Sequence, residues 1–162
     1  MNKKQGKPIV LTGPDYDSTL KIASLLAEKL SFMFLDVNRE IERRDGRSVQ
    51  RIHMLMGEHE VHNLEDKILD EIVDEGKPVI AAFSQGIVLD PQNRDILRSD
   101  SVRCVWIDLS EALLKALGYD NRAADRYRMR RPLFEEVSDI SAEDADELLE
   151  KLTISLVDDS ES

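Results

Sequence analysis

The stretch that decides the fold is Pro8–Thr19, which reads Pro-Ile-Val-Leu-Thr-Gly-Pro-Asp-Tyr-Asp-Ser-Thr. Its apolar run Ile9–Thr12 predicts a buried strand, apolar on both faces as parallel strands are. The Gly13-Pro14 pair then breaks the strand. Apolar residues at three- and four-residue spacing over Leu20–Leu30 predict a helix with one face toward a core. A short polar loop therefore joins a strand to a helix, which is the setting of phosphate-binding loops.

The loop itself departs from the phosphate-binding pattern. That pattern, Gly-x-x-x-x-Gly-Lys-Ser/Thr, uses glycines that let backbone N–H groups surround the phosphates and a lysine that neutralises them. Here only four residues separate Gly13 from Ser18, two fewer than the pattern requires, and the second glycine and the lysine are missing. Asp15 and Asp17 stand in the loop instead. We expect Asp17 or Ser18, just before Thr19, to cap the following helix.

Composition and charge narrow the class of protein. The chain has 162 residues, 41% hydrophobic and 34% charged, which is typical of a soluble globular domain. The formal net charge of −11 argues against free nucleic acid as a partner, because that binding depends on neutralising phosphates. No apolar run approaches the roughly 20 residues of a membrane span. We therefore expect no contact with a membrane. Cys104 is the only cysteine, so no intrachain disulfide can form, and we expect a cytoplasmic protein in which this thiol is an inert core residue.

Strands and helices are predicted to alternate through a single domain, residues 1–162, with flexible ends at 1–7 and 158–162. Besides Ile9–Thr12, strands are predicted at Phe32–Asp36, Val79–Phe83, Val102–Asp108 and Val137–Ile140. Helices are predicted near 20–30, 38–44, 49–56, 58–74, 90–98, 111–117, 122–130 and 142–156. This alternation predicts a three-layer α/β/α fold with a mostly parallel sheet of about five strands and Ile9–Thr12 at its centre. Ligands of such sheets bind beyond the carboxyl ends of the strands, here 13–17, 36–38, 84–86 and 108–110.

Four short motifs, in order along the chain, resemble those of the shikimate kinase family. They are Ile9-x-Leu11-x-Gly13-Pro14, Phe34-Leu35-Asp36-Val37-Asn38-Arg39-Glu40-Ile41-Glu42, Gly57-Glu58 with the later Glu65 and Leu69, and Arg130-Arg131-Pro132-Leu133-Phe134-Glu135-Glu136-Val137-Ser138-Asp139. The resemblance covers almost the whole chain and implies a P-loop kinase-like fold. It also implies descent from enzymes that use ATP and magnesium to phosphorylate a hydroxyl group.

The resemblance assigns roles to three residues that keep the family's chemistry. Ser18 matches the hydroxyl that would hold magnesium. Asp36 matches the acid near that metal. Arg130 matches a substrate-binding arginine late in the chain. These three residues are the ones through which nucleotide, metal or an anionic ligand would be held.

Other family positions carry a different residue here. Asp17 falls where the phosphate-binding lysine is expected, Asn38 where a substrate-binding aspartate is expected, and His62 where a substrate-binding arginine is expected. The family's glycines under the substrate ring align with Phe83-Ser84-Gln85 or, shifted by one, with Ser84-Gln85-Gly86. The lid over the phosphates is shortened to about residues 119–129. Because phosphoryl transfer depends on positioning and charge stabilisation, these changes bear directly on activity.

The leading interpretation is a shikimate-kinase-like domain that has lost ATP-dependent activity and acts as a binding, regulatory or interaction protein, with no cofactor. The alternative is an active small-molecule kinase with an unusual loop, using ATP and magnesium. A third possibility is a pocket that holds a small anionic ligand through Arg130, and a protein partner is also open.

Three local patterns leave alternatives open. Arginines between Arg122 and Arg131 either grip an anion or pair with nearby acids. Tyr16 either fills the vacated nucleotide site or lies on the surface. His59 and His62 are one residue short of the spacing that zinc-binding helices use, so we interpret them as surface or pocket residues.

Overall fold

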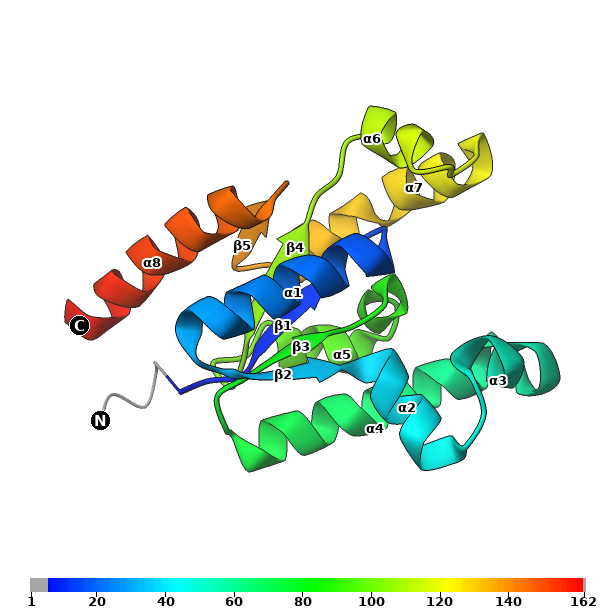
Figure 1. Ribbon diagram of the computed structural model, residues 1–162, viewed down its shortest axis with the longest axis horizontal. Coiled ribbons are helices and arrows are strands. Elements are labelled where there is room, and N and C mark those ends of the chain that lie inside the picture. Colours follow the sequence, from blue (N-terminus) through cyan, green and yellow to red (C-terminus); the bar gives the residue numbers. More distant parts are fainter. Residues whose placement is uncertain (1–5, 162) are drawn as a thin grey trace.

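The structure, a computed structural model, describes residues 6–161 and, for 155–161, the backbone alone. Five strands form one sheet in the order β2-β3-β1-β4-β5, and every pairing is parallel (Figure 1). Their bounds are β1 Ile9–Thr12, β2 Met33–Asp36, β3 Val79–Ala82, β4 Arg103–Ile107 and β5 Ile140–Ala142. The predicted fold class is confirmed, including the central position of β1.

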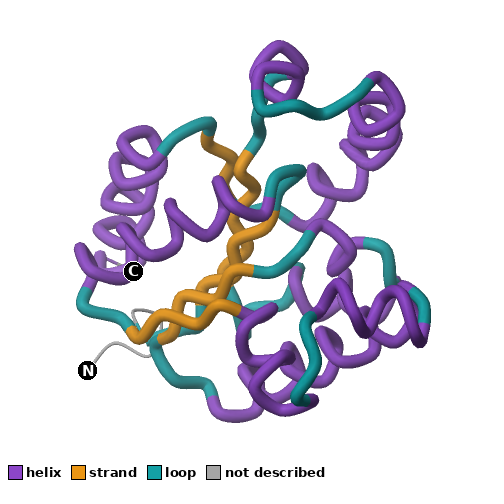
Figure 2. The backbone as a smooth tube through the Cα atoms, turned by 45° about the vertical axis from the view of Figure 1, so that its right-hand side comes forward, coloured by secondary structure: helices purple, strands orange, loops and turns teal. Residues whose placement is uncertain are grey.

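Helices cover both faces of the sheet. They are α1 Tyr16–Leu30, α2 Val37–Asp45, α3 Val49–Met56, α4 Glu58–Glu75, η1 Gln85–Val88, α5 Pro91–Leu97, α6 Glu111–Ala116, α7 Asn121–Val137 and α8 Ala145–Glu161. α1 and α8 lie together on one face, and α4, α5 and the second half of α7 lie on the other (Figure 2). α3 with the start of α4, and α6 with the first part of α7, project beyond the carboxyl ends of the strands (Figure 1). No helix among the described residues is both long and apolar enough to cross a membrane.

The central strand is buried along its whole length, as its uninterrupted apolar run predicts. Ile9, Val10 and Leu11 are at most 1% exposed, and β4 is buried throughout. Burial of this kind stabilises the fold by roughly 25 cal/mol for each Å² of apolar surface removed from water. Cys104 lies in β4 and is fully buried, and burial raises the pKa of its thiol, so it is an inert core residue.

The end of the chain differs from the prediction. α7 does not stop near Arg130 but continues through Pro132 to Val137, and the fifth strand begins at Ile140 rather than at Val137. Proline inside a helix removes one backbone hydrogen bond. Packing offsets this loss, because Phe134 is fully buried and stacks on Trp106 at 5.5 Å between ring centroids.

One helix cap is also corrected. Asp15, rather than Asp17 or Ser18, caps α1, and its carboxylate accepts from the backbone N–H of Ser18. At the start of α8, the Asp144 carboxylate accepts from the N–H of Glu147, at 2.8 Å. The helix α8 itself extends to residue 161, whereas Met1–Gln5 and Ser162 lie outside the described residues, so the flexibility expected there stays a prediction.

Candidate functional site

The loop between β1 and α1 contains only three residues, Gly13, Pro14 and Asp15. A side chain at Gly13 is excluded because its Cβ would lie 2.6 Å from the carbonyl oxygen of Ile107, in the neighbouring strand. The loop is therefore packed against β4. It has no room to form the wide ring of backbone N–H groups that surrounds a phosphate.

Asp15 occupies the N-terminus of α1, where a phosphate would otherwise be held. Its carboxylate accepts from the backbone N–H of Ser18 at 3.0 Å, from the Ser18 hydroxyl, and from the Tyr119 hydroxyl. Burial raises the pKa of the Asp15 carboxyl, but the hydrogen bonds from Ser18 and Tyr119 outweigh it and hold that pKa below its usual value. The helix terminus thus already has its own anion, and Tyr119, from the loop between α6 and α7, is bonded to it.

Tyr16 joins this loop to the end of β2. Its hydroxyl donates to the Asp36 carboxylate and accepts from the backbone N–H of Asn38 at 3.1 Å. Burial and the hydrogen bond to Asp36 raise the pKa of the Tyr16 hydroxyl, so it stays protonated. Of the two alternatives for Tyr16, a free surface position is thereby excluded, since the side chain bridges two loops at the ligand end of the sheet.

The positions expected to hold magnesium are hydrogen-bonded to other groups of the protein. The Ser18 hydroxyl donates to Asp15, and the Asp36 carboxylate accepts from Tyr16 and from the N–H of Arg39. Asp17 is exposed and lies on the first turn of α1. Among the residues that the structure describes, no cluster of three or more histidine, cysteine or acidic side chains is arranged to hold a metal ion.

A cavity of about 420 Å³ lies beyond β2 and β3, between α2, α3, α4 and η1. Its lining residues are Asn38, Val49, Gln50, His53, Glu58, Val61, His62, Glu65 and Ser84. Three of the residues predicted to form a ligand pocket, Asn38, His62 and Ser84, therefore come together here. The lining includes two carboxyl groups and neither lysine nor arginine.

Glu65 is the functional candidate that the sequence analysis missed. It is 1% exposed, its Oε1 accepts from the Ser84 hydroxyl at 2.8 Å, and its Oε2 has no hydrogen-bond partner. Burial raises the pKa of the Glu65 carboxyl to about 8. The signal was present in the sequence, since Glu65 interrupts the apolar face that Val61, Ile68 and Ile72 give to α4.

A second acceptor beside this cavity also lacks a partner. The side-chain carbonyl oxygen of Asn38 is buried and accepts no hydrogen bond. Gln85, at the start of η1, likewise has an unpartnered buried oxygen. Buried acceptors without partners are uncommon and costly, and several at one end of a sheet indicate a missing hydrogen-bond donor.

His62 lies against η1. A Cβ added to Gly86 would be 2.5 Å from the ring Nε2 of His62, so the imidazole packs directly on the glycine backbone. The same nitrogen is 3.8 Å from the carboxylate of Glu58. His62 and His59 therefore lie in or beside pockets, as predicted, and His62 separates the main cavity from a smaller one that also contains Gly86.

The arginines of α7 divide into two groups. Arg131 forms a bidentate ion pair with Asp108 at 2.7 and 3.0 Å, and Arg128 pairs with Glu111 and Asp125. No hydrogen bond or ion pair is found for the side chains of a second group of described residues, Arg122, Arg126 and Arg130. The pairing alternative thus holds for Arg128 and Arg131, and anion binding by the other arginines stays a prediction.

Arg130 is not among the residues that line the cavity. Burial and the neighbouring charge of Arg126 lower the pKa of its guanidinium, whereas the charge of Glu58 acts in the opposite direction. The arginine expected to hold a ligand thus lies near the cavity's Glu58 but does not form its wall.

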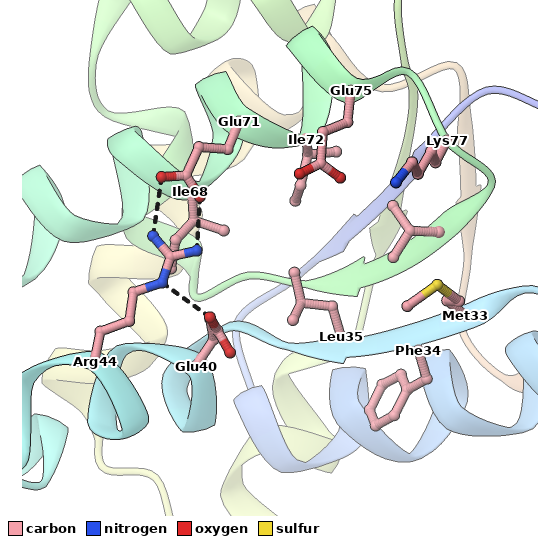
Figure 3. Close-up of a pocket in the computed structure, with 11 residues that line it drawn as sticks. Met33, Phe34, Leu35, Glu40, Arg44, Ile68, Glu71, Ile72, Glu75 and Lys77 are labelled. Carbon is pink, nitrogen blue, oxygen red and sulfur yellow. Dashed lines mark hydrogen bonds and ion pairs between the residues drawn. The ribbon is translucent and has the colours of Figure 1, made fainter.

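A separate groove of about 230 Å³ lies beside the edge strand β2 (Figure 3). Its floor is apolar and includes Leu35 and Ile72, and Arg44 bonds both Glu71 and Glu40 at one end. None of its lining residues belongs to the β1–α1 loop or to the main cavity. The groove is therefore not part of the candidate site.

Comparison with known proteins agrees with the resemblance. The sequence model of the family described as shikimate kinase matches residues 20–161. A shikimate kinase of Aromatoleum aromaticum is 31% identical over 144 residues, which cover 82% of each chain. A bifunctional shikimate kinase/3-dehydroquinate synthase of Thermotoga maritima is 33% identical over 114 residues, but this match covers only 23% of that protein.

Solved structures show the same fold. A shikimate kinase from Acinetobacter baumannii, solved in complex with shikimate, superposes with a TM-score of 0.77 at 24% sequence identity. The superposition covers 95% of this chain and 94% of that one.

Proposed function

This chain belongs to the shikimate kinase family, and we propose that it is a member that binds a small ligand in the cavity beside Asn38 and Glu65 without transferring phosphate from ATP. The observation that carries the proposal is the closed β1–α1 loop. Its three residues leave no ring of N–H groups, and the Asp15 carboxylate is bonded to the helix terminus that a phosphate would need.

Electrostatics support the same proposal. Two unit charges of the same sign about 5 Å apart repel by about 3 kcal/mol at an effective dielectric constant near 20. Asp15 and Asp17 therefore oppose a triphosphate at this terminus, where the family pattern supplies a lysine. No cofactor is part of the proposed function.

The second candidate function is an active shikimate kinase with an unusual loop. It is favoured by the relatives, which are named shikimate kinases at about 30% identity over most of this chain. In its favour the cavity still lies at the carboxyl end of the sheet, where a substrate hydroxyl would be presented to a nucleotide.

A coupled assay of ADP release with shikimate separates the two candidates. We expect no ADP release above the no-substrate background at millimolar ATP, magnesium and shikimate. Calorimetry should likewise show no micromolar shikimate binding, because His62 lacks the bidentate fork with which arginine holds a carboxylate. Shikimate-dependent turnover that Ser18→Ala abolishes would establish the active-kinase candidate instead.

A further inference from the structure

The edge strand β2 exposes apolar side chains to solvent. Among the strands that the structure describes it pairs only with β3, so its outer edge has no neighbouring strand. Met33 is 70% exposed and Phe34 is 40% exposed, whereas β1 is buried along its whole length. Natural sheets protect an open edge with lysine, proline, a bulge or a covering segment. Met33–Asp36 contains neither lysine nor proline, and the exposure of its first two residues shows that no described segment covers them.

Two hollows border this strand. The groove of about 230 Å³ beside β2 has Leu35 in its floor, and Phe34 points to the opposite side of the strand (Figure 3). Arg44 of α2 forms a bidentate ion pair with Glu71 of α4 at 3.0 and 2.6 Å, which holds one end of this groove in shape. A second hollow, of about 460 Å³, is lined by Phe34, Leu35, Asp36, Arg39, Glu40 and Arg43. The surface that flanks the strand is therefore preformed.

The charges on this surface favour a second copy of the chain as the partner. The two hollows are lined by four basic side chains and four acidic ones: Arg39, Arg43, Arg44 and Lys77, and Asp36, Glu40, Glu71 and Glu75. The surface is thus formally neutral in a chain whose net charge is −11, so two copies can meet here with little of the repulsion that the net charge produces. A strongly basic or strongly acidic segment would find no surplus of opposite charge.

Both signs of charge also occur at both ends of the strand. Arg44 and Glu71 lie beyond its carboxyl end, and Glu75 and Lys77 lie near its amino end (Figure 3). No hydrogen bond or ion pair is found for the side chains of Glu75 and Lys77, both of which the structure describes. When two such strands meet in opposite directions, each end of one copy faces the other end of its partner, and positive and negative groups are present on both sides.

We propose that β2 pairs with β2 of a second copy, so that two five-stranded sheets join into one sheet across a two-fold axis. Identical edge strands related by such an axis run antiparallel. The pairing supplies partners for the backbone N–H and C=O groups of the outer edge, and it buries Met33 and Phe34 against the other copy. This inference goes beyond the proposed function and does not depend on whether the chain transfers phosphate.

Sedimentation equilibrium of the full chain tests the proposal. A strand of four residues makes a small interface, so we expect a reversible dimer with a Kd of about 10–100 µM. Phe34→Glu and Met33→Glu each place a negative charge on the edge and should raise the Kd at least about tenfold. Met54→Glu adds the same charge on α3, where Met54 is 77% exposed, and should change the Kd by less than about twofold at physiological salt. Circular dichroism establishes that each variant is folded.

Cross-linking with a short bismaleimide locates the interface. Near a two-fold axis each side chain of the strand lies close to the same side chain of the other copy. Phe34→Cys should therefore give cross-linked dimers, whereas Met54→Cys, at a more exposed position, should not. The unmodified protein gives the background, because Cys104 is fully buried.

A chain that remains monomeric up to about 500 µM would overturn the proposal and leave this edge to a different protein. A dimer whose Kd is unchanged by Phe34→Glu and Met33→Glu, or is raised equally by Met54→Glu, would also overturn it. Equally efficient cross-linking of Met54→Cys and Phe34→Cys would do the same, since the contact would then not be confined to β2. None of these results depends on ATP or shikimate, so they are distinct from the tests of the proposed function.

Discussion

Asp15 is the residue that keeps the β1–α1 loop closed. The residue is 9% exposed, and its carboxylate accepts hydrogen bonds from Ser18 and Tyr119. Replacing Asp15 by alanine removes a helix cap and leaves the Tyr119 hydroxyl without its hydrogen-bond acceptor. We expect the free energy of unfolding to fall by about 1–3 kcal/mol, measured by urea denaturation at pH 7.

The neighbouring Asp17 gives a matched control, because it is exposed and its side chain does not cap the helix. Asp17→Ala should change the free energy of unfolding by less than about 0.5 kcal/mol.

The loss of unfolding free energy in Asp15→Ala should also depend on pH. The pKa of Asp15 is lowered in the folded protein, so its stabilisation is present above its ordinary pKa of 3.8 and disappears as the pH falls below it. Equal effects of the two alanine variants would show that Asp15 has no special role.

The Glu65 carboxyl makes the free energy of unfolding depend on pH in the opposite direction. With a folded pKa of about 8 against an ordinary value of 4.5, the folded protein keeps this proton over a range in which the unfolded chain loses it. The free energy of unfolding therefore falls as the pH rises from about 4.5 to about 8, by at most about 1.4 kcal/mol per pH unit from this group.

Glu65→Gln removes this dependence, since glutamine does not titrate. We expect the stability of the variant, relative to the unmodified protein, to rise across pH 5–8 in urea denaturation series. Glu75→Gln, exposed on the same helix, should give a curve parallel to that of the unmodified protein. A Glu65→Gln curve that also runs parallel would mean that Glu65 is ionised in the folded state.

At the scale of elements, α4 packs against η1 where the imidazole of His62 contacts the backbone of Gly86. Gly86→Ala would place a Cβ 2.5 Å from the imidazole of His62, so the histidine or η1 must move. We expect a loss of about 1–3 kcal/mol in the free energy of unfolding, as for other overpacking changes.

A double-mutant cycle checks the origin of that loss. In a His62→Ala background the same Gly86→Ala change should cost less than about 0.5 kcal/mol, because the space is then open. If the loss is the same in both backgrounds, the backbone of η1 rather than the contact with His62 is responsible.

The elements were predictable from sequence wherever a local pattern decides them. β1 and α1 follow from the uninterrupted apolar run and from the helical spacing after it. The end of α7 was not predictable in this way, because a proline at 132 normally ends a helix and only the contact of Phe134 with Trp106 compensates. The cap at Asp15 was missed for a related reason, since Asp15, Asp17 and Ser18 are all of residue types that cap helices and the local pattern does not choose among them.

At the scale of the whole molecule, the candidate site could be located from sequence but its chemistry could not. The carboxyl ends of parallel strands meet at one edge, so Asn38 and Ser84 were expected near each other and both line the cavity. The unpartnered oxygens of Glu65 and Asn38, and the absence of Arg130 from the wall, depend on how side chains from four elements meet, which no local pattern encodes.

The β1–α1 loop and the cavity lie at the same end of the sheet, and both lack positively charged residues that the family pattern has. The loop has aspartates where the family pattern has a lysine, and the cavity is lined by acids without a positively charged partner. Both differences make this end of the molecule more negative, in a chain whose net charge is −11.

The central claim, that the β1–α1 loop does not hold nucleotide, is tested most directly by equilibrium dialysis of radiolabelled ATP with magnesium against the unmodified protein. A variant in which 15–17 are replaced by a full-length glycine- and lysine-containing loop serves as the comparison. We predict no saturable ATP binding by the unmodified protein up to millimolar concentration. Saturable binding in that range, abolished by Ser18→Ala, would contradict the account.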